Sequence, residues 1–324
     1  MQQRFRAAAL MVFLLTPSIS SAELSKEQIK EKFEGIVLFN QYKTSTSKLL
    51  PAAEAGDAEA QYYLAEEIRS QKQYLSSDAV KWYEASARQG NIYAMIRLGR
   101  AGTDLCVEMK NCQQSDTSPK DWIEKAKKIT LPNAEQGNGE ALYFMYELTG
   151  DLNWLESSAK NGYAISQYLL ATLQKQGEGS FWLPGQRDRS VEHWMKASAE
   201  GGYPIGMVAY GGILARKGDI EGYKKWRIKS AEAGYADSVL AYATGSAHEP
   251  DDYGYPLDLV KAYGLTLLLA ELDGGGGMQA DIKDLIPRIE SKMTESDMKK
   301  GKKFADQWRS THPPLSFFPD QLDE

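Results

Sequence analysis

Histidine and cysteine are scarce in this chain, which contains three histidines and two cysteines among its 324 residues. His193, His248 and His312 lie far apart and do not form the His-Glu-x-x-His spacing of a zinc protease. The chain has no Gly-x-Ser-x-Gly motif, and no Lys-Ser or Lys-Thr follows the glycine run 274–277, as a phosphate-binding loop would require. We therefore expect a protein that is not an enzyme and has no catalytic residue, no metal site and no cofactor.

Long apolar segments are also missing, apart from one near the start of the chain. Residues 7–15 form an apolar run that is too short to span a bilayer as a helix. This run follows Arg4 and Arg6 and precedes small residues at Ser20 and Ala22, which is the pattern of a secretory signal peptide. We predict that residues 1–22 are removed by cleavage after Ala22 and that the protein is periplasmic, with an uncleaved anchor and full secretion as the alternatives.

The two cysteines, Cys106 and Cys112, are close together in the sequence. An oxidising compartment favours a disulfide between them. A metal site would need further ligands, and no histidine lies nearby. We predict a disulfide, with two free thiols as the alternative.

An excess of basic residues is absent as well, since the formal net charge is −6. Loss of Arg4 and Arg6 with the signal peptide would make the charge more negative. Nucleic acids and anionic membrane surfaces attract basic proteins. We expect neither as the main partner, and we expect no transmembrane segment.

One short pattern occurs six times in the chain: an alanine, two residues, a glycine, three residues and a small residue. Its glycines, separated by 25 to 47 residues, are Gly56, Gly90, Gly137, Gly162, Gly202 and Gly234. Four of them have a tryptophan eight residues upstream, at Trp82, Trp154, Trp194 and Trp226. Repeats of this length indicate stacked pairs of helices, and the rarity of alternating β-branched runs favours an all-α protein.

Each block is interpreted as a helix, a tight turn and the start of a second helix. The glycine stands where a helix end needs a left-handed residue, which glycine adopts without a steric penalty. The small residue four positions later, such as Ala60 or Ala94, would let two helices approach closely. No single pair of helices buries enough apolar area by itself, so the repeats are expected to stack into one continuous core.

The block Ala-x-x-Gly-x-x-x-Ala-x-x-x-Leu-Gly, preceded by Trp-x-x-x-Ala, resembles the Sel-one-like repeat (Sel1-like repeat), a relative of the tetratricopeptide repeat. The resemblance covers about residues 48–310 and implies a right-handed α-solenoid of helix-turn-helix repeats. It divides the chain into a signal peptide (1–22), an N-terminal capping segment (23–47), a repeat array (48–272), C-terminal capping helices (273–312) and a tail (313–324).

In the related tetratricopeptide fold, one helix of each pair lines the concave face, and this comparison selects a set of candidate residues. Counting from the repeat glycines, the expected partner-binding residues are Glu59, Tyr62, Glu66, Tyr93, Glu140, Tyr143, Glu147 and Tyr168. Tyrosines are enriched at binding hot spots, and the acids would form a charged rim. Packing of these tyrosines between repeats is the alternative. A second candidate surface is the loop 178–188, with Phe181 and Trp182.

The resemblance further implies a function. Some Sel-one-like repeat proteins with signal peptides resemble periplasmic immunity proteins that neutralise phospholipase effectors of type VI secretion. We therefore expect a protein partner, most simply such a secreted phospholipase. An envelope adaptor or signalling regulator that docks another protein is the alternative, and a hydrolase of cell-wall or lactam substrates is a third and weaker hypothesis because catalytic residues are missing.

Overall fold

The computed structural model describes residues 23–113, 115–272 and 277–322. The predicted signal peptide and its cleavage site after Ala22 lie outside the described residues, as do most of the glycine run and residues 323–324. Within the described ranges the secondary structure is helical, and an isolated bridge between Tyr235 and Ser316 is the only strand-like pairing there. The prediction of an all-α fold is confirmed.

Six pairs of helices carry the repeated blocks. The pairs are α2 (Thr46–Glu54) with α3 (Ala58–Lys72), α4 (Ser77–Arg88) with α5 (Ile92–Gly99), α7 (Pro119–Glu135) with α8 (Gly139–Thr149), α9 (Leu152–Lys160) with α10 (Ala164–Gln176), α11 (Gln186–Glu200) with α12 (Pro204–Arg216), and α13 (Ile220–Glu232) with α14 (Ala236–Ala247). The repeat glycine joins each pair, and all six have φ between +81° and +96°. The predicted left-handed turns are confirmed.

Further helices stand before, within and after the repeats. Helix α1 (Lys26–Asn40) precedes them, and α15 (Leu259–Ala270), α16 (Gly277–Glu290) and α17 (Glu295–Thr311) follow. Between α5 and α7 lie a short 3₁₀ turn, η1 (Ala101–Thr103), and α6 (Leu105–Glu108). This insert contains the disulfide between Cys106 and Cys112, so that prediction is confirmed.

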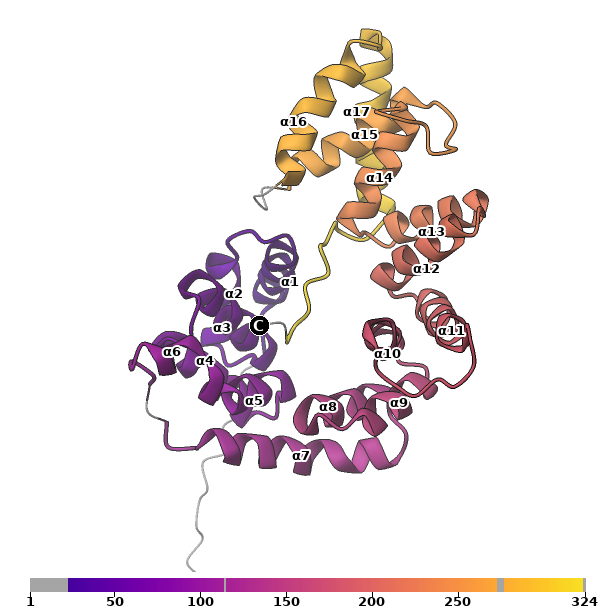
Figure 1. Cartoon of the computed structure of the whole chain (residues 1–324). Helices are drawn as coiled ribbons and strands as arrows, with labels where there is room; N and C mark the ends of the chain where they lie inside the picture. Colours follow the sequence, from indigo (N-terminus) through magenta and orange to yellow (C-terminus); the bar gives the residue numbers. More distant parts are fainter. Residues whose placement is uncertain (1–22, 114, 273–276, 323–324) are drawn as a thin grey trace, which may run out of the picture.

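The helices pack mainly on their neighbours in sequence, which makes the molecule a solenoid. Figure 1 shows the chain curving from α1 through α7 and α9 to α14, with α15–α17 stacked at the far end. The curve leaves an opening, with α1 on one side of it and α12 and α13 on the other. The last described residues run across this opening, and the candidate site lies where they contact the repeats.

Buried serines tie four of the repeats to the repeat before them. In four blocks a serine precedes the repeat alanine, and its hydroxyl donates to a main-chain carbonyl at the start of the previous repeat's second helix. These bonds run from Ser86 to Ala58 (2.6 Å), from Ser158 to Gly139 (2.6 Å), from Ser198 to Ala164 (2.7 Å) and from Ser230 to Pro204 (2.9 Å). The four serines are completely buried. They fix the stacking of consecutive repeats, a role that the glycine pattern alone does not reveal.

The small residues after the turns do allow close approach. Ala60, Ala94 and Ser166 are fully buried. At Gly206, an added Cβ would lie 2.2 Å from the Ser198 hydroxyl, so no larger residue fits there without movement. The prediction that a small residue four positions after the repeat glycine lets two helices approach closely is confirmed.

Candidate functional site

An extended segment of the chain occupies the concave side of the solenoid. After α17, residues 313–322, here called the tail strand, turn back from the C-terminal helices toward the N-terminal repeats (Figure 1). Two sets of contacts hold the tail strand, one near its beginning and one at its end. We call them the outer anchor and the inner anchor.

The outer anchor fixes residues 315–317 by main-chain hydrogen bonds. The Ser316 amide donates to the Gly234 carbonyl over 2.8 Å, and the Ala236 amide donates to the Ser316 carbonyl over 3.0 Å. On the other side, the Phe317 amide donates to the Asn40 carbonyl over 2.9 Å. The tail strand thereby joins the last repeat to the end of α1, and it closes the opening of the curve.

The inner anchor consists of side chains that donate to the carbonyls of Gln321 and Leu322. Arg97 donates to the Gln321 carbonyl over 3.1 Å and to the Leu322 carbonyl over 3.2 Å. Arg100 also donates to the Leu322 carbonyl over 3.2 Å, and the Tyr62 hydroxyl donates to the Gln321 carbonyl. The Leu322 side chain is only 4% exposed and belongs to the main apolar core. The inner anchor therefore combines charge-assisted hydrogen bonds to the main chain with one apolar pocket.

Arg97 is held in place by a buried ion pair with Glu66. Its Nε lies 2.7 Å from Glu66 Oε1, and both side chains are almost completely buried. The Tyr83 hydroxyl donates to the same carboxylate oxygen over 2.8 Å. Burial by itself lowers the pKa of Arg97, but Glu66, Tyr83 and Tyr62 together more than offset this and the pKa is raised. The guanidinium stays charged and its free N–H groups point at the tail strand.

Arg100 is oriented in the same way by an acidic residue of the next repeat. Its Nη2 lies 2.6 Å from Glu147 Oε2, and the Glu147 side chain is largely buried. Because the second guanidinium nitrogen contacts Leu322, one arginine links two repeats and the tail strand. Glu66 pairs with Arg97 and, over 3.4 Å, with Arg69, and Glu147 pairs with Arg100, so both arginines of the inner anchor have an acidic partner.

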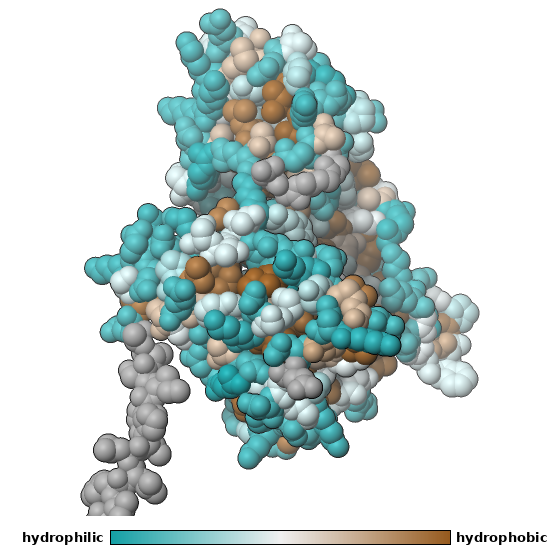
Figure 2. Space-filling model, turned by 90° about the vertical axis from the view of Figure 1, so that its left-hand side faces the viewer, coloured by the Kyte–Doolittle hydropathy of each residue, from teal (hydrophilic) through white to brown (hydrophobic). Residues whose placement is uncertain are grey.

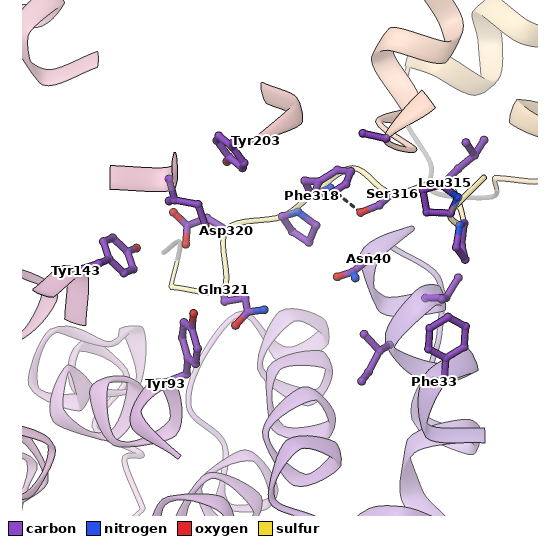
Figure 3. Close-up of a pocket in the computed structure, with 17 residues that line it drawn as sticks. Phe33, Asn40, Tyr93, Tyr143, Tyr203, Leu315, Ser316, Phe318, Asp320 and Gln321 are labelled. Atoms are coloured by element: carbon purple, nitrogen blue, oxygen red, sulfur yellow. Dashed lines mark hydrogen bonds between the residues drawn. The ribbon is translucent and has the colours of Figure 1, made fainter. Parts of the chain in front are cut away.

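Tyrosines from three repeats lie near the exposed Asp320 side chain. Figure 3 shows Tyr93, Tyr143 and Tyr203 directed toward the part of the tail strand that contains Asp320 and Gln321. Burial raises the pKa of each of these three tyrosines, and the Asp320 carboxylate adds to the shift in each case. The hydroxyls therefore stay protonated, and the Asp320 carboxylate itself accepts a hydrogen bond from the Leu322 amide over 2.9 Å.

A cavity of about 360 Å³ lies beside the tail strand. One wall is apolar and comes from α1, with Phe33, Ile36 and Val37, and the other contains Tyr93 and Tyr143. The concave face is thus not filled by the tail strand alone. It has room for side chains larger than those now present.

The structure places the predicted partner-binding residues in three different settings. Tyr62 and Tyr143 are buried, whereas Tyr93 and Tyr168 are partly exposed. Glu59 is exposed and pairs with Lys32 of α1 over 3.1 Å, and Glu140 is exposed. Their role toward a partner stays a prediction.

The rim predicted for the acids needs a correction. Glu66 is only 4% exposed and its charge is neutralised by Arg97, so it cannot act as a solvent-facing rim residue. Glu147 is likewise engaged by Arg100. Both acids instead orient the arginines that hold the tail strand.

Sequence reasoning missed Arg97 and the tail strand. An arginine inside the apolar stretch Ile92-Tyr-Ala-Met-Ile-Arg-Leu-Gly99 is unusual, because a buried arginine needs a partner. The arginine in this apolar stretch was therefore the sequence feature that indicated a buried polar site. The partner, Glu66, lies in the preceding repeat, and no sequence pattern connects the two.

Other parts of the surface are weaker candidates for a partner-binding site. Figure 2 shows a face on which hydrophilic side chains predominate and apolar ones gather in small patches near the middle. In the loop 178–188, Trp182 is 89% exposed, while Phe181 is partly covered by the Arg187 guanidinium. This loop has apolar side chains without a shaped pocket around them, so the concave face remains the stronger candidate.

The described residues contain no cluster of three or more histidine, cysteine or acidic side chains that could hold a metal ion. Among the helices of the described part of the chain, none is both long and apolar enough to cross a membrane.

Comparison with known proteins gives several similar solved structures, two of which are the following. No family model matches the chain, and no curated protein matches it. One structure is c5321, described as a protective antigen of uropathogenic Escherichia coli strains with an SLR fold, with 19% identity, a TM-score of 0.46, and coverage of 89% of this chain and 62% of that chain. The other is a Sel1 repeat protein from Oxalobacter formigenes, with 22% identity, a TM-score of 0.34, and coverage of 65% of this chain and 64% of that chain. This chain therefore spans less than two thirds of the length of either protein.

Proposed function

We propose that this protein is a non-catalytic solenoid that binds another protein through its concave face. The observation that carries the proposal is the tail strand itself, because it shows this face holding an extended peptide. Arg97, Arg100 and Tyr62 contact main-chain carbonyls, which every peptide offers. The partly exposed Tyr93 and the cavity beside it supply a rigid aromatic surface of the kind found at binding hot spots.

In its specific form, the proposal is that the protein is a periplasmic immunity protein and that its partner is a phospholipase effector of type VI secretion. The signal-peptide pattern at residues 1–22 and the disulfide in the insert support an oxidising compartment outside the cytosol. The resemblance to Sel-one-like repeat proteins supports the choice of partner. A soluble binder of this kind would block the active site of the phospholipase or its route to the membrane.

Inhibition of a purified phospholipase tests this proposal. The candidate enzyme is a phospholipase encoded beside the gene of this protein, and its hydrolysis of phospholipid vesicles is measured with increasing amounts of this protein. We expect inhibition to be complete at one equivalent. Tyr143→Ala should speed dissociation by a factor that corresponds to about 2 kcal/mol or more if this residue is a hot spot. Unchanged hydrolysis at an excess of this protein would contradict the immunity role and would favour the adaptor hypothesis.

A further inference from the structure

The tail strand occupies the surface that the proposed function assigns to a partner. We propose that the partner inserts a short segment in place of residues 319–322, with an acidic side chain at the position of Asp320 and a leucine-sized apolar side chain at the position of Leu322. This inference rests on the proposed function only in that the concave face binds a protein. The tail strand is then the intramolecular competitor of that segment.

The inner anchor defines what such a segment must provide. Arg97 and Arg100 direct charged N–H groups at two consecutive carbonyls, and the Tyr62 hydroxyl adds a third donor. A buried charged donor without an acceptor is costly, so the face favours an occupant that offers main-chain carbonyls at these two positions. A flat or convex partner surface without an exposed strand could not reach these donors.

Two features of the end of the tail strand define the side chains. The Leu322 side chain enters the apolar core next to the second helices of the first repeats, and it is nearly completely buried. Two residues earlier, the exposed Asp320 lies near Tyr93 and Tyr143 (Figure 3), and its Oδ1 accepts a hydrogen bond from the Leu322 amide over 2.9 Å. The acid thereby closes the turn at residues 321–322 that leads the apolar side chain into the core. An acid followed two residues later by an apolar residue reproduces this arrangement.

The junction between the two anchors is less buried than Leu315 and Ser316 on one side and Leu322 on the other. Phe318 has φ +49°, a left-handed conformation that is uncommon for a residue with a side chain. Residues 318–321 are partly or fully exposed and border the cavity, whereas Leu315 and Ser316 are buried in the outer anchor. The inner part can therefore be exchanged while the outer anchor keeps the solenoid closed.

A labelled synthetic peptide tests this without any phospholipase. The peptide has the sequence of residues 313–322, and its fluorescence anisotropy is followed as the full-length protein is added. Leu322→Asp places a charge in the apolar pocket and should release the chain's own tail strand. The control is Leu257→Asp. This substitution makes the same chemical change at a site away from the tail strand, where the leucine is 59% exposed. Leu322→Ala replaces Leu322→Asp if circular dichroism shows that the charged variant does not fold.

We expect the peptide to bind the Leu322 variant at least about tenfold more tightly than the wild type or the Leu257→Asp control, because the competitor is gone. A peptide with alanine in place of Asp320 should bind that variant at least about tenfold more weakly. Equal binding to all three proteins, or no binding to folded Leu322 variants, would overturn the inference. Dimers of the variant formed by exchange of tails would overturn it too. The two experiments fail independently. A peptide that does not bind says nothing against inhibition of a phospholipase, and a phospholipase that is not inhibited says nothing against peptide binding.

Discussion

Replacement of Gly234 by alanine should weaken the outer anchor, and Gly202 provides a matched control. Both glycines occupy the same turn of their repeats, with φ of +89° at Gly234 and +88° at Gly202. An added Cβ at Gly202 would meet no atom within 4 Å. At Gly234 it would lie 2.8 Å from the main-chain oxygen of Pro314, which belongs to the tail strand. The two substitutions differ mainly in this contact.

The expected magnitudes follow from these contacts. A left-handed residue with a side chain costs about 1–2 kcal/mol, and both variants share this loss. At Gly234 the clash with a main-chain atom can be relieved only if the tail strand moves. That movement would break the two hydrogen bonds of Ser316 with Gly234 and Ala236, each worth about 0.5–1.5 kcal/mol. We expect a loss of about 1–2 kcal/mol for Gly202→Ala and of about 2–5 kcal/mol for Gly234→Ala.

Urea unfolding measures the two losses, and limited digestion with chymotrypsin reports on the tail strand at Phe317 and Phe318. Gly234→Ala should be cleaved there faster than the wild type, while Gly202→Ala should not. If the two variants lose the same stability within about 0.5 kcal/mol and are cleaved at equal rates, the tail strand is not docked against Gly234.

Three further outcomes are expected. Ser198→Ala should destabilise the protein by about 1–2 kcal/mol in urea unfolding, because it removes the hydroxyl that ties two repeats together; a loss below about 0.3 kcal/mol would show that this bond does not contribute. Reduction of the disulfide between Cys106 and Cys112 should cost at most about 2–3 kcal/mol, because it closes a short loop, and a loss of the whole fold on reduction would contradict this. Burial raises the pKa of Tyr62 well above its ordinary value and that of Tyr63 from 10.0 to about 12. The stability that comes from burying neutral tyrosines is therefore present below pH 10.0 and should fall as the pH rises toward about 12, with tyrosinate absorbance appearing together with loss of helical circular dichroism; ionisation at the ordinary pKa with the helices intact would argue against this burial.

The fold could be predicted from the sequence because its signals are local. The repeat glycines mark turns that only a left-handed residue can make, and a small residue four positions later marks each helix contact. The disulfide was predictable from two cysteines that are neighbours in sequence.

The candidate site could be predicted only in part, because its contacts are distant in sequence. Counting from the glycines selected Tyr93 and Tyr143, which line the cavity, yet it assigned Glu66 to the rim although Glu66 is buried and paired with Arg97. The tail strand has no periodicity that would show where it binds. Its position depends on carbonyl contacts with Arg97, which any extended sequence could make.

The affinity of the proposed phospholipase partner for wild-type protein and for Leu322→Asp is the most direct test of the account, and isothermal titration calorimetry can measure it. If partner and tail strand share one site, the variant should bind the partner at least about tenfold more tightly, because no binding energy is then lost in displacing the tail strand. Leu257→Asp should bind like the wild type. Equal or weaker binding by a folded Leu322→Asp protein would show that the partner does not replace the tail strand on the concave face.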